Sequence, residues 1–215
     1  MKRPDLMALY ASVPVAPEPL AAKLLDLLVT ESKGYLKEYY AQLQLVEEQG
    51  EYDAARESLD LKGRNDLLDR VKRDCSSTFV VYLSVGVYPA QIYVSLLADG
   101  ASGTAVLLRI DPVITRSVED EPDTRMRVTM FLARVASVIG AEWFISGTGI
   151  EQYRPLRVEQ LEDVRPWGKL YVVGWKARSL NEAAILNAFE PPPKSVKPST
   201  MGITFFTDFP RVEAS

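Results

Sequence analysis

Apolar positions recur at helical spacing through the first third of the chain. From Pro17 to about Arg73 many of them are three, four or seven residues apart, as on one face of a helix. The pattern predicts a helical segment whose apolar face contains Leu20, Leu24, Leu27, Leu28, Tyr35, Tyr39, Leu43 and Val46. Pro17 and Pro19 suit a helix start, where a missing N–H costs no hydrogen bond. Gly34 either splits this segment or lies inside one long helix.

A second, more charged helical stretch follows Gly50 and runs from about Tyr52 to Arg73. Its Gly63-Arg64-Asn65 sequence predicts a break. Asn65 is expected to cap the final piece, because an asparagine side chain can accept a hydrogen bond from a free N–H of the first helical turn.

After Cys75 the pattern changes to short apolar runs that are typical of strands. Three of them are TFVVYLSV (78–85), QIYVSLLA (91–98) and TAVLLRI (104–110), separated by the turn-favouring GVYPA and DGASG. Connections this short make neighbouring strands antiparallel, so the runs predict a three-stranded meander. Both faces of each strand are fairly apolar, which indicates cover on both sides or a helix packed on one.

An amphipathic helix is predicted after the acidic run SVEDEPDT. Asp123 or Thr124 is expected to cap its start, and Gly140 is expected to end it in a left-handed conformation. Its apolar stripe consists of Val128, Phe131, Leu132, Val135, Val138 and Ile139.

The remaining sequence predicts further strands and short helices. Strands are expected at 141–146, 168–175 and 202–209, a short helix or turn at 157–164, a helix at 180–189, and an extended proline-rich connector at 191–198. The whole chain is therefore expected to form one α+β domain, residues 1–215. A helical N-terminal segment (1–75) packs on a mainly antiparallel sheet of five to six strands (76–215) with one long amphipathic helix.

Composition removes several classes of chemistry. The 215 residues are 47% hydrophobic, which suffices for one core, and they include no histidine and one cysteine. Without histidine there is no Ser-His or Cys-His nucleophile pair and no HExxH metal site. No cofactor is expected, and a metal site built only of carboxylates is the remaining metal hypothesis.

Charge and hydropathy argue against nucleic acid and membrane as partners. The net charge is −4, and no stretch shows the basic excess that phosphate binding requires. No apolar run approaches the ~20 residues of a membrane-spanning helix. The start MKRPDLMALYASVPVA has some features of a signal peptide, but Pro4 and Asp5 break its start and Pro14 interrupts its apolar run. A cytoplasmic protein is expected.

Two stretches are candidate sites. Ser146-Gly147-Thr148-Gly149 could form an anion-binding nest, but no lysine or helix start follows, so a plain turn is predicted. The acidic run Glu119-Asp120-Glu121-Pro122-Asp123 is a solvated loop, a docking surface for a basic partner or a weak hard-metal site. Carboxylates at strand ends, Asp99, Asp111 and Glu142, could serve a hydrolase, although nothing in the sequence selects any two of them.

The layout resembles the immunity proteins of bacterial polymorphic toxin systems. The resemblance covers roughly residues 78–209 and depends on SVGVY between Ser84 and Tyr88, AEWFIS after a helix, and WGKLYVVGW. It implies a small cytoplasmic α+β protein without catalytic residues that binds and neutralises a cognate toxin. Specificity in that family lies in surface loops, often acidic ones that face a basic toxin.

The sequence thus favours a non-enzymatic protein that binds one protein partner, a basic toxin, as a monomer or homodimer. The candidate binding residues are Glu119, Asp120, Glu121 and Asp123, with Tyr88 at a neighbouring hairpin tip. Two alternatives remain open at this point. One is a carboxylate-based hydrolase that can require Mg²⁺, and the other is an assembly subunit of a phage or secretion apparatus.

Overall fold

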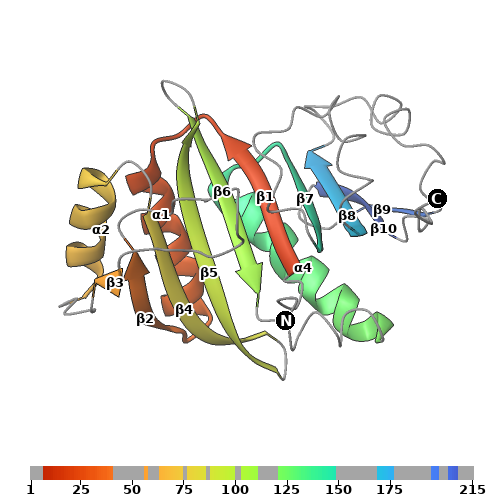
Figure 1. The fold of residues 1–215 in the computed structure, drawn as a ribbon. Coiled ribbons are helices and arrows are strands. Elements are labelled where there is room, and N and C mark those ends of the chain that lie inside the picture. The colour runs from red at the N-terminus through yellow and green to blue at the C-terminus, as the bar shows by residue number, and fades with distance from the viewer. Residues whose placement is uncertain are drawn as a thin grey trace, which may run out of the picture.

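Within the residues that it describes, the computed structural model of the chain has ten strands in a single sheet (Figure 1). The structure describes residues 7–40, 56–57, 63–74, 77–85, 88–99, 103–110, 121–148, 169–176, 195–198 and 203–207. The strands are β1 Met7–Val13, β2 Tyr35–Tyr40, β3 Arg56–Glu57, β4 Ser77–Val85, β5 Tyr88–Asp99, β6 Gly103–Ile110, β7 Trp143–Thr148, β8 Lys169–Lys176, β9 Ser195–Pro198 and β10 Ile203–Thr207. Their order is β3-β2-β4-β5-β6-β1-β7-β8-β10-β9, and every described pairing is antiparallel.

The described helices lie on one side of this sheet and at its β2–β3 end. They are α1 Pro17–Leu25, which continues as the π-helix η1 Asp26–Glu31, then α2 Arg64–Arg73 and α4 Pro122–Ile139. Figure 1 shows α1 behind β4 and β5, α4 behind β1 and β7, and α2 beside β2. The fold is therefore α+β, as predicted. None of the described helices is long and apolar enough to cross a membrane.

The hydrophobic core lies between one face of the sheet and the helices α1 and α4. Alternate residues of the central strands point to the helices and are buried, because successive side chains of a strand lie on opposite faces. The core includes Leu9, Ala11 and Val13 of β1, Phe79, Val81 and Leu83 of β4, Ile92, Val94 and Leu96 of β5, Val106, Leu108 and Ile110 of β6, and Leu20, Leu24, Leu132 and Val135 of the helices. Several residues of the opposite face, such as Val80, Leu107 and Ile145, are buried too. That explains why the strands read as apolar on both faces.

The predicted meander is confirmed. Strands β4, β5 and β6 are neighbours, and their bounds differ from the predicted ones by three residues at most. The long amphipathic helix is confirmed as α4, and Gly140 follows it with a φ of 78°. Strands β7, β8 and β10 correspond to the predicted later strands. The segments predicted as helical at 157–164 and 180–189 lie outside the described residues.

The prediction of helix was wrong at residues 35–40, which form β2. A bulge between Leu36 and Glu38 inserts one extra residue into this strand. Leu36 packs against the core and Tyr39 lies in it, although they are three residues apart. In a regular strand they would face opposite sides, so the bulge produces a spacing that looks helical.

The part of the chain before β4 differs from the prediction in three further places. Residues 7–13 form β1, a central strand that the sequence analysis did not assign. Gly63, not Asn65, is the N-cap of α2, which begins at Arg64. Residues 56–57 form the short strand β3 within a stretch predicted as helix.

Two predicted loops contain strands. Ser146, Gly147 and Thr148 were predicted as a turn, but they belong to β7 and pair with both β1 and β8. The β7–β8 register shifts between Ser146 and Gly147, because β8 carries one extra residue, Tyr171, at this point. Residues 195–198 of the predicted proline-rich connector form β9 at the sheet edge, where a proline is tolerated because no partner requires its N–H.

Gly34 is expected to be required for the turn between η1 and β2. A Cβ at this position would lie 2.4 Å from the Leu28 carbonyl oxygen and 2.8 Å from Val81 Cγ1. Because the first of these contacts is with backbone, Gly34→Ala should lower the free energy of unfolding by about 2–4 kcal/mol in urea denaturation.

Gly140→Ala is the matched control for this substitution. Its φ of 78° is unfavourable for alanine, but nothing lies within 4 Å of the added carbon. The cost should be about 1 kcal/mol, from backbone strain alone. Equal stability of wild type and Gly34→Ala would contradict the described packing.

Candidate functional site

The start of β5 and the start of α4 meet at the surface. The Tyr88 hydroxyl donates a hydrogen bond to Glu121 Oε2 over 3.0 Å. The Thr124 hydroxyl donates to the same oxygen over 2.7 Å. Glu121 is exposed and Tyr88 partly exposed, so a phenol and a carboxylate lie side by side facing solvent. We call Tyr88, Glu121 and Asp123 the acidic patch.

Local sequence sets the position of Glu121. Pro122 occupies the first turn of α4, and the residue before a proline is biased to extended backbone. Glu121 accordingly has φ −118° and ψ 108° and is the N-cap, although its side chain caps no backbone N–H. The prediction that Asp123 or Thr124 caps α4 was wrong by two to three residues.

The two hydroxyl donors lower the pKa of Glu121 below its ordinary value of 4.5, with Thr124 contributing more than Tyr88. Slight desolvation opposes them. The carboxylate is therefore anionic at neutral pH. Exposed Asp123 adds a second acidic side chain in the first turn, where the helix dipole favours negative charge.

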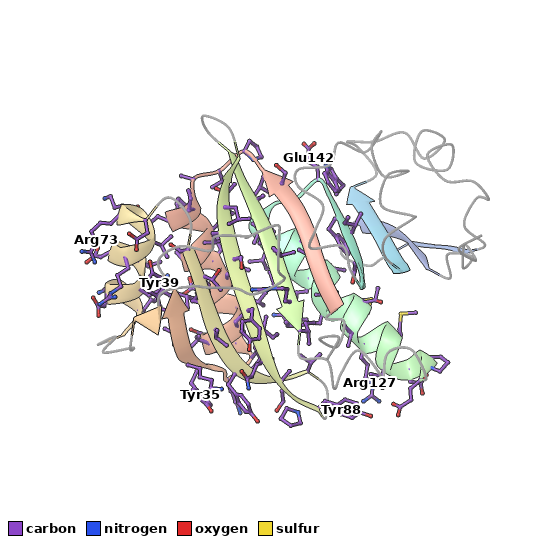
Figure 2. The ribbon with its side chains drawn as sticks, in the orientation of Figure 1. Tyr35, Tyr39, Arg73, Tyr88, Arg127 and Glu142 are labelled. Atoms are coloured by element: carbon purple, nitrogen blue, oxygen red, sulfur yellow. The ribbon has the colours of Figure 1, made fainter. Side chains whose placement is uncertain are left out.

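The structure brings together some of the predicted binding residues. Tyr88, Glu121 and Asp123 lie at one end of the sheet, and exposed Arg127 lies one helical turn beyond Asp123 (Figure 2). Glu119 and Asp120 lie outside the described residues. The contact between Tyr88 and Glu121 joins segments 33 residues apart, as the expected neighbouring hairpin tip requires.

Two tyrosines near this end were not foreseen as surface residues. Tyr35 is 57% exposed, and its ring centroid is 5.4 Å from that of Tyr82 on the adjacent strand. The helical spacing of apolar residues predicts Tyr35 on a helix face, and that prediction gave no indication of the pairing with Tyr82. Its only sequence signal is the run of aromatic residues in YLKEYY.

A buried polar cluster ties β2, the end of α2 and the start of β4 together. The Tyr39 hydroxyl donates to Asp74 Oδ2 over 2.6 Å and lies 3.2 Å from Ser77 Oγ. The guanidinium carbon of Arg70 is 5.7 Å from the centroid of the Tyr39 ring. Burial, followed by the hydrogen bond to Asp74, raises the pKa of Tyr39 well above 10.0. Tyr39 is 1% exposed, so its hydrogen bond to Asp74 stabilises the fold and its phenol is not available to a partner.

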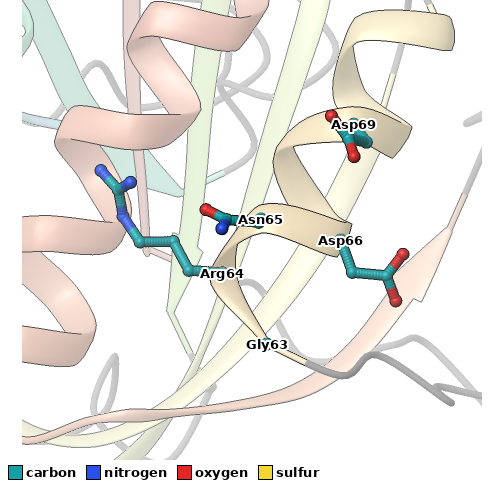
Figure 3. Close-up of a pocket in the computed structure, with 5 residues that line it drawn as sticks. All are labelled: Gly63, Arg64, Asn65, Asp66 and Asp69. Carbon is teal, nitrogen blue, oxygen red and sulfur yellow. The ribbon is translucent and has the colours of Figure 1, made fainter.

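An open hollow of about 410 Å³ lies at the N-terminus of α2 (Figure 3). Gly63, Arg64, Asn65, Asp66 and Asp69 line it. Arg64 points towards α1, where its Nε and Nη2 donate to the two carboxylate oxygens of Asp26 over 3.1 Å each. The hollow thus presents carboxylates beside a guanidinium that is already bound to another acid.

The other sequence candidates give no further site in the described part of the chain. No three histidine, cysteine, aspartate or glutamate side chains of the described residues are grouped closely enough to hold a metal ion. Glu142 is exposed just before β7, and Asp111 lies outside the described residues. Ser146 is fully buried, so its hydroxyl is not accessible to an anion in solution.

Comparison with known proteins finds no match: no protein-family model matches the chain, and no curated protein or solved structure is significantly similar to it.

Removing the hydroxyl donors should raise the pKa of Glu121. Thr124→Val should raise it more than Tyr88→Phe, and the double variant should bring it close to 4.5, measured by NMR titration of the side-chain carboxyl carbon. Because the folded pKa is depressed, the stabilisation exists above the unfolded pKa and is lost as pH falls through the folded value. Tyr35→Phe, which does not touch Glu121, is the control. An unchanged pKa in the double variant would contradict the shared hydrogen bonds.

Tyr39→Phe should lower the free energy of unfolding by about 2 kcal/mol at neutral pH, because the Asp74 carboxylate loses a donor. The folded pKa of Tyr39 is raised, so its stabilisation is full below pH ~10 and declines as pH rises further. The phenylalanine variant should lose this alkaline dependence. Urea denaturation at pH about 7 and about 11 measures both effects. If Tyr39→Phe is as stable as wild type at neutral pH, the stabilising hydrogen bond to Asp74 is contradicted.

Proposed function

We propose that this chain is a non-enzymatic protein that binds and neutralises a toxin through the acidic patch. The observation that carries the proposal is the hydrogen bond from Tyr88 to Glu121, which fixes a phenol beside an anionic carboxylate at the surface. The resemblance to toxin-immunity proteins supports the same function.

Preorganisation is the first reason why this arrangement suits a binding surface. Association costs free energy when side chains must be ordered at an interface. The Glu121 carboxylate is already held by Tyr88 and Thr124 in the free protein. Because this carboxylate is already ordered before a partner binds, less side-chain conformational entropy is lost on binding.

The chemistry of the patch suits a basic partner. Glu121 and Asp123 present negative charge at the dipole-favoured start of α4, and such charge accelerates encounter with lysine and arginine residues. Tyrosine is enriched among the residues that dominate binding energy, because it contributes a large rigid surface and a polar end. A partner arginine can pack on the Tyr88 ring while it pairs with Glu121.

A tagged pull-down from the native host, identified by mass spectrometry, should recover one stoichiometric basic protein whose toxicity the chain suppresses. Recovery of the chain alone, or only with itself, would contradict the proposal. It would favour a metal and substrate screen for the hydrolase alternative, or assembly measurements for the structural one.

With that partner in hand, the double substitution Glu121→Gln and Asp123→Asn should slow association about fivefold at low salt and flatten its salt dependence. The control carries Asp69→Asn and Glu142→Gln, which remove the same net charge from exposed acids elsewhere. Stopped-flow kinetics across a salt series distinguishes them. Equal association rates for the two double variants would exclude the patch from the interface.

A further inference from the structure

The backbone departs from regular geometry three times within residues 26–38. Residues Asp26–Glu31 form a π-helix, a rare conformation that is frequent at functional sites. Lys33 has a φ of 54°, which is uncommon for a residue other than glycine and is often tied to function. A bulge then interrupts β2 between Leu36 and Glu38. Each feature has a cost, and all three fall in one short segment.

The π-helix and the bulge border one groove of about 460 Å³ between the helical layer and β2, and Lys33 lies in the turn between them. Leu25 and Val29 form its helical wall, Tyr35, Leu36 and Lys37 its strand wall, and Arg64 lies at its α2 end. The volume falls in the range of ligand-binding clefts. The groove is distinct from the acidic patch, with which it shares no residue.

The strand wall also offers backbone hydrogen bonds. β2 pairs with β4 from Tyr35 to Tyr40, but on its outer side β3 pairs only with Tyr39 and Tyr40. Within the described residues, the outer edge of Tyr35–Lys37 thus has no strand partner. An unpaired edge beside an apolar groove is the geometry that binds extended peptides by strand addition.

The side chains define what such a peptide should carry. Leu25, Val29 and Leu36 provide apolar contact, and Tyr35 leaves 57% of its surface exposed beside them. Arg64 is already bound to Asp26. Lys37 lines the groove, and Lys33 lies in the turn before β2; both are exposed and form no ion pair with any described residue. The groove is therefore apolar at its base and positive at its rim.

We propose that this groove binds an extended segment of a partner protein, which adds a strand to the outer edge of β2 at Tyr35–Lys37. The segment alternates apolar residues, which enter the groove, with acidic residues, which face Lys37 and Lys33. This interaction goes beyond the proposed toxin binding, because the acidic patch selects for basic residues and the groove for acidic ones.

The test uses the full-length protein and a fluorescein-labelled peptide that alternates valine with glutamate. Binding is measured by fluorescence anisotropy, and amide protection by NMR hydrogen exchange. The peptide is expected to bind and to protect backbone amides on the outer edge of residues 35–37. The same peptide with two backbone N-methyl groups should bind about tenfold more weakly, because it cannot form the corresponding hydrogen bonds. A peptide with lysine in place of glutamate should also bind more weakly.

Reversing the charge of Lys37 is the second part of the test. Lys37→Glu should weaken binding of the glutamate peptide about threefold and strengthen that of the lysine peptide, since the pair is near the surface. Lys23→Glu on α1 makes the same change at an exposed lysine that does not line the groove. The control should bind like wild type.

Failure of every peptide to bind or to protect residues 35–37 would overturn the proposal, as would binding that N-methylation leaves unchanged. Lys37 would then serve only to discourage edge-to-edge pairing between copies of the chain. Neither result depends on toxin binding, which is measured with the partner recovered from the host.

Discussion

The hydrogen-bond ladders on both sides of β1 hold the two parts of the sheet together. One ladder runs from Met7–Ile110 to Val13–Thr104 with β6, and the other from Met7–Thr148 to Tyr10–Ile145 with β7. Without β1, β6 and β7 would each present an unpaired edge in the middle of the fold. The position of helix α4 depends on the same strand, because α4 contacts β1 and β7. The position of the acidic patch at the start of α4 therefore depends on the pairing of β1.

The elements that were predicted correctly are those with a clear local pattern of apolar residues. The strands β4, β5 and β6 were identified from apolar runs and short connections, and α4 from its apolar stripe and Gly140. The run MALYASV of β1 carries the same local signal. The central position of β1 in the sheet depends on pairing with β6 and β7, which are far along the chain, and local periodicity does not show such pairing. β7 also pairs with a distant segment and was predicted, so β1 was missed because its run was considered only as part of a possible signal peptide.

One bulge and one run of small residues account for the clearest errors. In β2 the bulge after Leu36 places it and Tyr39 on the same side of the strand, which imitates the spacing of a helix. This error follows from the period of two in a strand, because one extra residue reverses the sides of all that follow. In β7 the small residues Ser146 and Gly147 suggest a turn by their composition, but they belong to a strand that pairs on both sides.

The candidate sites were predictable to different degrees. Acidic charge near α4 and a tyrosine at the hairpin are visible in the sequence, and their spatial proximity was expected from the hairpin. The sharing of one Glu121 oxygen by Tyr88 and Thr124 depends on side-chain geometry that no pattern encodes. The groove beside β2 was not predictable at all. It requires the π-helix, the bulge and the short reach of β3, and each of these is a property of packing between separate segments.

The two proposed surfaces lie at the same end of the sheet and differ in charge. Tyr35 pairs with Tyr82 on β4, and three residues further along β4 Val85 pairs with Tyr88, a step of about 10 Å. Figure 2 shows Tyr35 and Tyr88 at this common end. A partner with a basic surface and an acidic extended segment would engage both, and its second contact would form at high effective concentration. In the reversed orientation, basic residues would meet Lys37 and acidic residues would meet Glu121, so like charges would oppose binding. Two weak contacts of opposite sign would thus fix the orientation of a partner, which neither contact could do alone.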